Sequence, residues 1–107
     1  MFEAEKIADD VVNEVAAVVR RIRGDAELAR QMRNATQSLS NNLGEGAGRR
    51  GKERLKFYEY AYGSGRELRR QLKFAVAFGH VPDASLESLR AHLDSLLAIL
   101  WTLTHRR

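Results

Sequence analysis

The chain has 107 residues, of which 44% are apolar and 30% charged, and these proportions are ordinary for a soluble globular protein. It has one proline and no cysteine, which excludes a disulfide framework and a thiolate metal site. A chain of 107 residues is the length of one domain, so we expect one domain spanning residues 1–107 with a single core; its net charge is +4.

Apolar residues recur at spacings of three and four along almost the whole chain, which predicts helices and no strands. The first apolar stripe covers residues 7–22 and ends at Gly24 and Asp25. The second covers residues 28–43 and runs into a glycine-rich stretch, residues 44–51. The first half of the chain therefore predicts two helices.

The second half of the chain repeats this pattern. A third stripe covers residues 52–78 and is closed by Gly79 and Pro82. A fourth covers residues 86–103, and the basic residues 105–107 suit the negative end of its dipole. Because the connections are short, we expect an all-α protein, an antiparallel up-down-up-down four-helix bundle.

The glycine-rich stretch reads GEGAGRRGKE and contains the spacing of a phosphate-binding loop. Gly46, Gly51 and Lys52 match that motif, but Glu53 stands where it needs Ser or Thr. A nucleotide loop also follows a strand, whereas this segment follows a predicted helix. We therefore interpret the glycines as helix punctuation: Gly46 or Gly48 ends the second helix, and Gly51 permits the turn into the third.

A family resemblance is carried by the same region. The stretch QMRNATQSLSNNLGEG at residues 31–46, then Gly48, Arg49 and Arg50, then AYGSGRELRRQL at residues 61–72, resembles the bacterial proteins encoded in intervening sequences of 23S rRNA genes. The accessory variability protein of diversity-generating retroelements is similar. The resemblance implies an antiparallel four-helix bundle that assembles as a ring-like homopentamer, with a role in contacting nucleic acid or a nucleic-acid enzyme.

The residues themselves also favour an oligomer. Aromatic residues 57–62 occupy about 200° of the third helix, more than the roughly 100° that a core-facing stripe needs. A subunit interface is the commonest destination for such a surplus. Gly63, Ser64 and Gly65 lie in the middle of this helix, where they predict either close approach of another backbone or a kink.

The polar residues of the matching stretches have two interpretations. Asn42 and Glu45 could hydrogen-bond into the third helix, and Glu45 or Glu67 could pair with an arginine such as Arg49 across the bundle or to a neighbouring subunit. The same carboxylates could instead perform acid–base chemistry, but no nucleophile or paired histidine accompanies them. We therefore assign Asn42, Glu45, Glu67 and the small residues 46, 63 and 64 to structure.

The positive charge is concentrated in one segment. Residues 49–73 carry nine basic side chains against three acids, whereas residues 1–19 carry five acids against one lysine. Arg49, Arg50, Lys52, Arg54 and Lys56 surround the start of the third helix, where free amides also attract anions. Three nearby tyrosines, residues 58, 60 and 62, could offer stacking faces. The segment is a candidate phosphate-binding surface, or else a solvated face that balances the acidic first helix.

Enzymatic chemistry finds little support. His80, His92 and His105 show no metal-ligand spacing, so we expect no metal and no cofactor. Helical ribonucleases with an arginine four to six residues before a histidine are a rival by fold. The nearest upstream arginine is Arg90, only two residues before His92, so that catalytic pair is missing. We expect no catalytic residues.

The start of the chain, MFEAEKIADD, is acidic where a secretory signal is basic, and the longest apolar run, residues 96–101, is far shorter than the roughly 20 residues of a membrane span. We therefore expect a cytoplasmic protein with no membrane partner. The leading hypothesis is a non-enzymatic homo-oligomer that binds nucleic acid electrostatically as an accessory protein. Its expected partners are further copies of the chain, RNA or DNA, and a nucleic-acid enzyme. The alternative is a protein-binding scaffold whose basic face meets an acidic partner; a small enzyme is the third.

Overall fold

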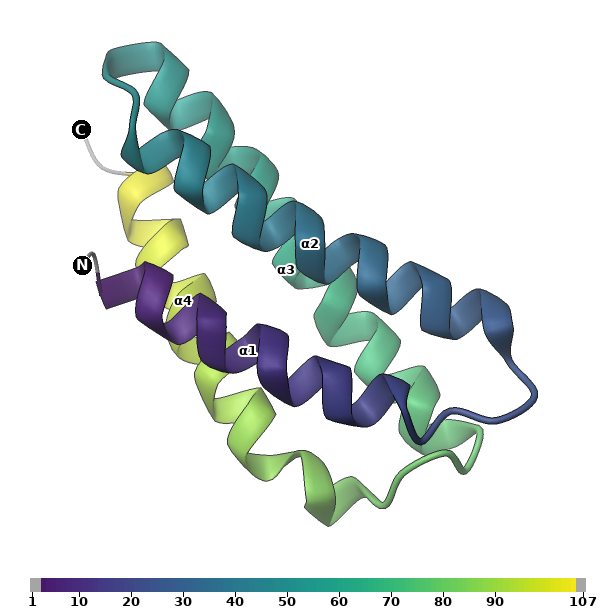
Figure 1. The fold of residues 1–107 in the computed structure, drawn as a ribbon. Coiled ribbons are helices and arrows are strands. Elements are labelled where there is room, and N and C mark those ends of the chain that lie inside the picture. Colours follow the sequence, from purple (N-terminus) through teal and green to yellow (C-terminus); the bar gives the residue numbers. More distant parts are fainter. Residues whose placement is uncertain (1–2, 106–107) are drawn as a thin grey trace.

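A computed structural model describes residues 3–105, and this part of the chain is all-α (Figure 1). It forms four long helices and a short 3-10 helix. Their bounds are α1 Glu3–Val19, α2 Ala26–Ala47, α3 Gly51–Ala77, η1 Asp83–Leu86 and α4 Glu87–His105. The predicted all-helical character is confirmed. Arg106 and Arg107, expected near the end of the fourth helix, lie outside the described residues.

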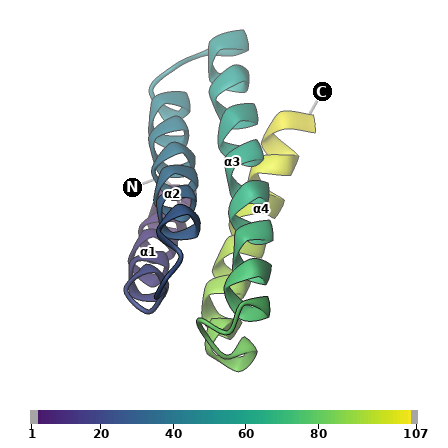
Figure 2. The same cartoon turned by 90° about the vertical axis from the view of Figure 1, so that its right-hand side faces the viewer.

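The helices are arranged so that each packs against two others. Helix α2 contacts α1 and α3, and α4 also contacts α1 and α3. Figure 2 shows α1 and α2 as one pair lying beside a second pair, α3 and α4. The whole measures 43 × 23 × 22 Å, so the bundle is about twice as long as it is wide.

The core between the helices is built mainly from leucine and small aliphatic residues. The buried residues of helix α1 are all alanine or valine, and those of α4 are five leucines. The fully buried side chains of the middle helices include Met32, Leu39, Leu68 and Leu72. Most residues of the predicted stripes therefore face the core, but the third stripe is exposed at both ends, at Leu55 and Phe78.

The ends of α2 and α3 are set by particular residues. The Asp25 carboxylate accepts a hydrogen bond from the Leu28 amide at 3.0 Å and so caps the start of α2. Helix α2 continues through Gly46 and is capped by Gly48, one of the two ends that the sequence allowed. Helix α3 begins at Gly51, whose φ of +60° is unfavourable for residues with a side chain.

The small residues of α3 do not interrupt it, because the helix is continuous over Gly51–Ala77. Gly65 lets α4 approach: a Cβ there would lie 2.7 Å from Leu97 Cδ2. Gly63 is different, because no atom lies within 4 Å of the position that its Cβ would take. Within one chain, then, close approach occurs at Gly65, and Gly63 faces outward.

Within residues 3–105, no helix is both long enough and apolar enough to cross a membrane.

Candidate nucleic-acid interface

The five predicted phosphate-binding residues lie at one end of the bundle, on the turn between α2 and α3 and the first turns of α3 (Figure 1). They are Arg49, Arg50, Lys52, Arg54 and Lys56, and all five are exposed. The chain thus brings together every residue of the predicted cluster. We call these five residues the end cluster.

Two carboxylates partly neutralise the end cluster. Arg49 lies 3.1 Å from Glu45 and 4.0 Å from Glu53, and Lys56 lies 3.2 Å from Glu53. Each of these pairs is about half exposed, and such pairs contribute only about 0–1 kcal/mol. A phosphate group can therefore replace a carboxylate here at little energetic cost.

Two cations of the end cluster lie against one aromatic ring, that of Phe57. The Arg49 guanidinium lies 5.4 Å from the centre of the Phe57 ring, and the Lys56 ammonium lies 5.3 Å from it. Tyr60 meets Phe57 edge-on, with ring centres 6.3 Å apart. Of the three predicted stacking tyrosines, Tyr60 is exposed, Tyr62 is half-buried and Tyr58 is buried. Tyr58 belongs to the apolar core, so it is not a stacking face, and its burial raises the pKa of its hydroxyl.

The start of α3 has no side-chain cap. Arg54 Nε donates to the Gly46 carbonyl at 3.2 Å, which holds the first turn of α3 against the end of α2. Arg50 is the N-cap residue, and no side chain caps the helix at this position. The amides of the first turn therefore point outward, next to Arg50 and Lys52.

A second basic cluster lies further along α3. It consists of Arg66, Arg69, Arg70 and Lys73, which line one open depression of the surface together with Gly63 and Glu67. Arg69 pairs with Asp94 of α4 at 2.8 Å, and Arg70 lies over Phe74. In the sequence these cations belong to the basic segment, residues 49–73. Their spacing of three, one and three residues already places them on one face of a helix.

The residues assigned to structure are placed differently from what was expected. Asn42 donates to the Ser38 carbonyl and hydroxyl within α2, and does not reach α3 itself. Glu45 pairs with Arg49, which follows it by four residues, and not across the bundle. Ser64 makes the link between the helices, because its hydroxyl donates to Ser38 Oγ at 2.8 Å.

The remaining structural residues lie on both sides of the α2–α3 contact. Gly46 is buried against Tyr58, and a Cβ there would lie 2.6 Å from Tyr58 Cε1. Glu67 lies in a polar groove between α2 and α3, together with Gln31, Asn34 and Gln71. This groove was not predicted, because its two walls come from separate helices.

The histidines make local and interhelical contacts: His92 joins two helices, His80 joins two loops, and His105 stacks on Trp101 within α4. His92 Nδ1 lies 2.6 Å from Glu14 Oε1, which ties α4 to α1, and this hydrogen bond raises the pKa of His92. His80 Nδ1 accepts a hydrogen bond from the Arg23 amide. Within residues 3–105, no group of three or more histidine, aspartate or glutamate residues is arranged to hold a metal ion.

Comparison with known proteins gives one result beyond the geometry. No curated protein matches the chain. A protein family does match, and the match covers residues 2–102, which is nearly the whole chain and includes α1, α2, α3 and most of α4. The chain therefore belongs to the family of 23S rRNA-intervening sequence proteins.

Proposed function

We propose that the protein is a non-enzymatic homo-oligomer of antiparallel four-helix bundles, assembled as a ring-like pentamer, that binds nucleic acid electrostatically as an accessory protein. The observation that carries the proposal is the exposure of all nine basic side chains of residues 49–73. The family supports RNA as the nucleic acid, because its name connects its members with 23S rRNA.

Phosphate contacts account for the composition of this surface. Arg50 and Lys52 flank the open start of α3, where helix amides and cations act on the same anion. Since a ring would repeat the end cluster in every subunit, weak single contacts would add up to strong binding. Such binding depends on the backbone of the nucleic acid and little on its sequence.

A salt titration tests the proposal. We expect fluorescence anisotropy with labelled RNA to show strong binding at about 50 mM salt, and log affinity for a duplex to fall with log salt by about 0.9 for each phosphate neutralised. Replacing Arg49, Arg50 and Lys52 together by Glu should abolish most of this binding and leave the oligomer intact. A matched control replaces Lys6, Arg21 and Arg23 by Glu, which changes the net charge equally at exposed positions outside the cluster.

Two outcomes contradict the proposal. An intact oligomer that retains neither duplex nor single-stranded RNA or DNA at about 50 mM salt supports the scaffold for an acidic protein instead. Equal losses in the triple variant and its control show that net charge alone drives binding, and the end cluster is then not the site.

A further inference from the structure

One face of α3 carries side chains at alternating spacings of four and three residues, and we call this set the α3 seam. Its members are Tyr60, Ser64, Glu67, Gln71, Phe74 and Phe78. A repeat of this kind is the pattern by which one helix packs along another. Yet Tyr60 is 55% exposed and Phe78 65% exposed. The α3 seam is therefore aromatic at both ends and polar in the middle. It is exposed at Tyr60, Glu67, Phe74 and Phe78 and buried at Ser64 and Gln71.

In the middle of the α3 seam, Gln71 has a buried hydrogen-bond acceptor that no donor of the described chain satisfies. Its side chain is only 8% exposed, and its Oε1 is buried without a hydrogen-bond partner within residues 3–105. It lines the polar groove between α2 and α3. A buried acceptor without a donor is unfavourable, so a donor from outside the chain would complete this groove.

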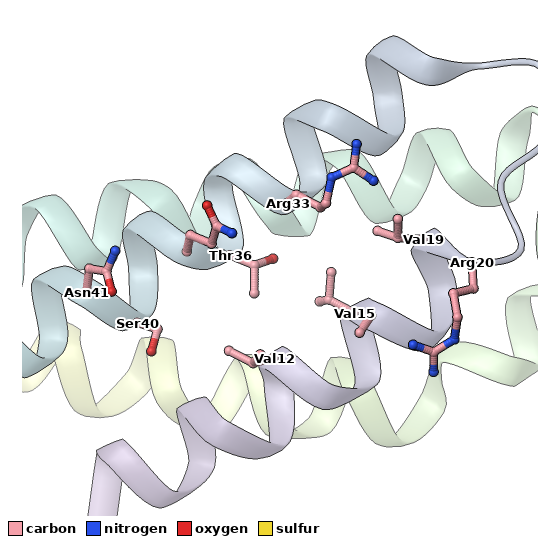
Figure 3. Close-up of a pocket in the computed structure, with 10 residues that line it drawn as sticks. Val12, Val15, Val19, Arg20, Arg33, Thr36, Ser40 and Asn41 are labelled. Carbon is pink, nitrogen blue, oxygen red and sulfur yellow. The ribbon is translucent and has the colours of Figure 1, made fainter.

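The neighbouring face of the bundle offers a surface of complementary chemistry. Between α1 and α2 lies an apolar groove of about 440 Å³. Figure 3 shows Val12, Val15 and Val19 of α1 along it, with Arg20 and Arg33 at one end. The α1–α2 groove therefore offers apolar surface for an aromatic ring and guanidinium donors for a carboxylate or an amide oxygen.

The α3 seam and the α1–α2 groove also lie at matching heights along the bundle. Ser64 is level with Ser38, to which it donates a hydrogen bond. Glu67 lies beside Asn34 in the polar groove and so is nearly level with Arg33. Rotation about a ring axis parallel to the bundle leaves these heights unchanged. In such a ring, Glu67 of one copy comes level with Arg33 of the next.

We propose that the α3 seam of one copy of this chain docks into the α1–α2 groove of the next copy, its polar middle facing Arg20 and Arg33. The proposal rests on the homo-oligomer proposed above and specifies its two contact surfaces. The guanidinium groups supply a counter-charge for Glu67 and a donor for Gln71. Gly63, which borders the seam with open space around it, lets the next backbone come close.

The position of the two surfaces suits a closed assembly. They are chemically different, so the contact is heterologous, unlike the self-complementary contact of a two-fold dimer. They also lie on adjacent faces of the bundle, since α2 borders both of them. Because the two surfaces lie on adjacent faces, each copy is rotated in the same direction relative to the copy before it. Repeated rotation of this kind favours a closed ring over a straight filament.

Disulfide cross-linking tests the contact directly, because the chain has no cysteine of its own. We expect Glu67→Cys alone and Arg33→Cys alone to give no covalent product. Refolded together and mildly oxidised, they should give a disulfide-linked dimer on a non-reducing gel. Mixing two single variants excludes a bond within one chain. The matched control pairs Arg33→Cys with Ala98→Cys, which is exposed on α4, outside both surfaces.

A second pair repeats the test without removing a charge. Tyr60→Cys and Asn41→Cys should also link only when mixed, because Asn41 lines the α1–α2 groove at the end away from the arginines (Figure 3). An oligomer, seen by light scattering, that cross-links in neither pair above the control contradicts the seam contact and leaves the proposed assembly standing. A monomer at micromolar concentration contradicts both. Linking of Glu67→Cys with itself indicates a two-fold contact and also overturns the proposal.

Discussion

Ser64 Oγ on α3 donates a hydrogen bond to Ser38 Oγ on α2 at 2.8 Å, at a point where both side chains are mostly covered. Asn42 donates to the same Ser38 hydroxyl from one turn further along α2. The two helices that contact each other most are thus joined by a short polar chain as well as by apolar packing. Hydroxyl groups this small let the helices stay close.

The first prediction concerns this link. Replacing Ser64 by Ala removes the donor but leaves Ser38 bonded to Asn42, so we expect the free energy of unfolding to fall by about 1 kcal/mol. Urea denaturation at one fixed protein concentration measures this change. Ser95→Ala, at an exposed position on α4, is the control and should change stability by less than about 0.5 kcal/mol. Equal effects at both positions would show that the link contributes nothing.

The helices could be predicted from the sequence because their apolar stripes have a clear period. The residues at which the helices begin and end are harder to predict from the sequence. Residues 20–22 continue the first apolar stripe, but α1 ends at Val19 and the chain turns there towards the Asp25 cap. The fourth helix is preceded by a 3-10 turn, which has almost the same residue spacing as an α-helix.

The candidate site was predictable as a group of charges but not as a set of contacts. Arg49 to Lys56 are adjacent in sequence, so their clustering follows from any fold. Which tyrosine is buried depends on which side of α3 meets α2, and that is a tertiary fact. The same is true of Asn42, whose choice of Ser38 over α3 depends on the helix spacing that Ser64 and Gly46 set.

The second prediction compares two glycines of one helix. A Cβ at Gly46 would lie 2.6 Å from Tyr58 Cε1, whereas none of the surrounding atoms lies within 4 Å of a Cβ at Gly44. We expect Gly46→Ala to destabilise the protein by about 1–3 kcal/mol through overpacking. Gly44→Ala should stabilise it by up to about 1 kcal/mol through helix propensity. Thermal unfolding of both variants decides, and effects of the same sign would contradict this account of Gly46.

The third prediction is a pH dependence. The hydrogen bond to Glu14 raises the pKa of His92 in the folded protein above its ordinary value. The resulting stabilisation is fully present below the ordinary pKa of about 6.5 and is lost as the pH rises through the raised one. We therefore expect His92→Gln to lower the melting temperature more at about pH 5.5 than at about pH 9. In a Glu14→Gln background the difference between the two pH values should disappear. A loss independent of pH would show that His92 acts only by packing.

The last prediction uses the open space around Gly63. Because no atom of the described chain lies within 4 Å of a Cβ there, Gly63→Leu should leave the single bundle folded, and its helix content by circular dichroism should not fall. At the docking surface proposed for α3, however, the new side chain would hold the next copy away. We expect size exclusion with light scattering to show loss of the oligomer, or at least a tenfold weaker assembly, which corresponds to about 1.4 kcal/mol. Gly63→Ala should have a smaller effect in the same direction.

Ala98→Leu adds a similar apolar surface on exposed α4 and should leave assembly unchanged, so it controls for added hydrophobicity. A Gly63→Leu protein that assembles as fully as the unaltered chain would place Gly63 outside every subunit contact, and the α3 seam would then need another partner.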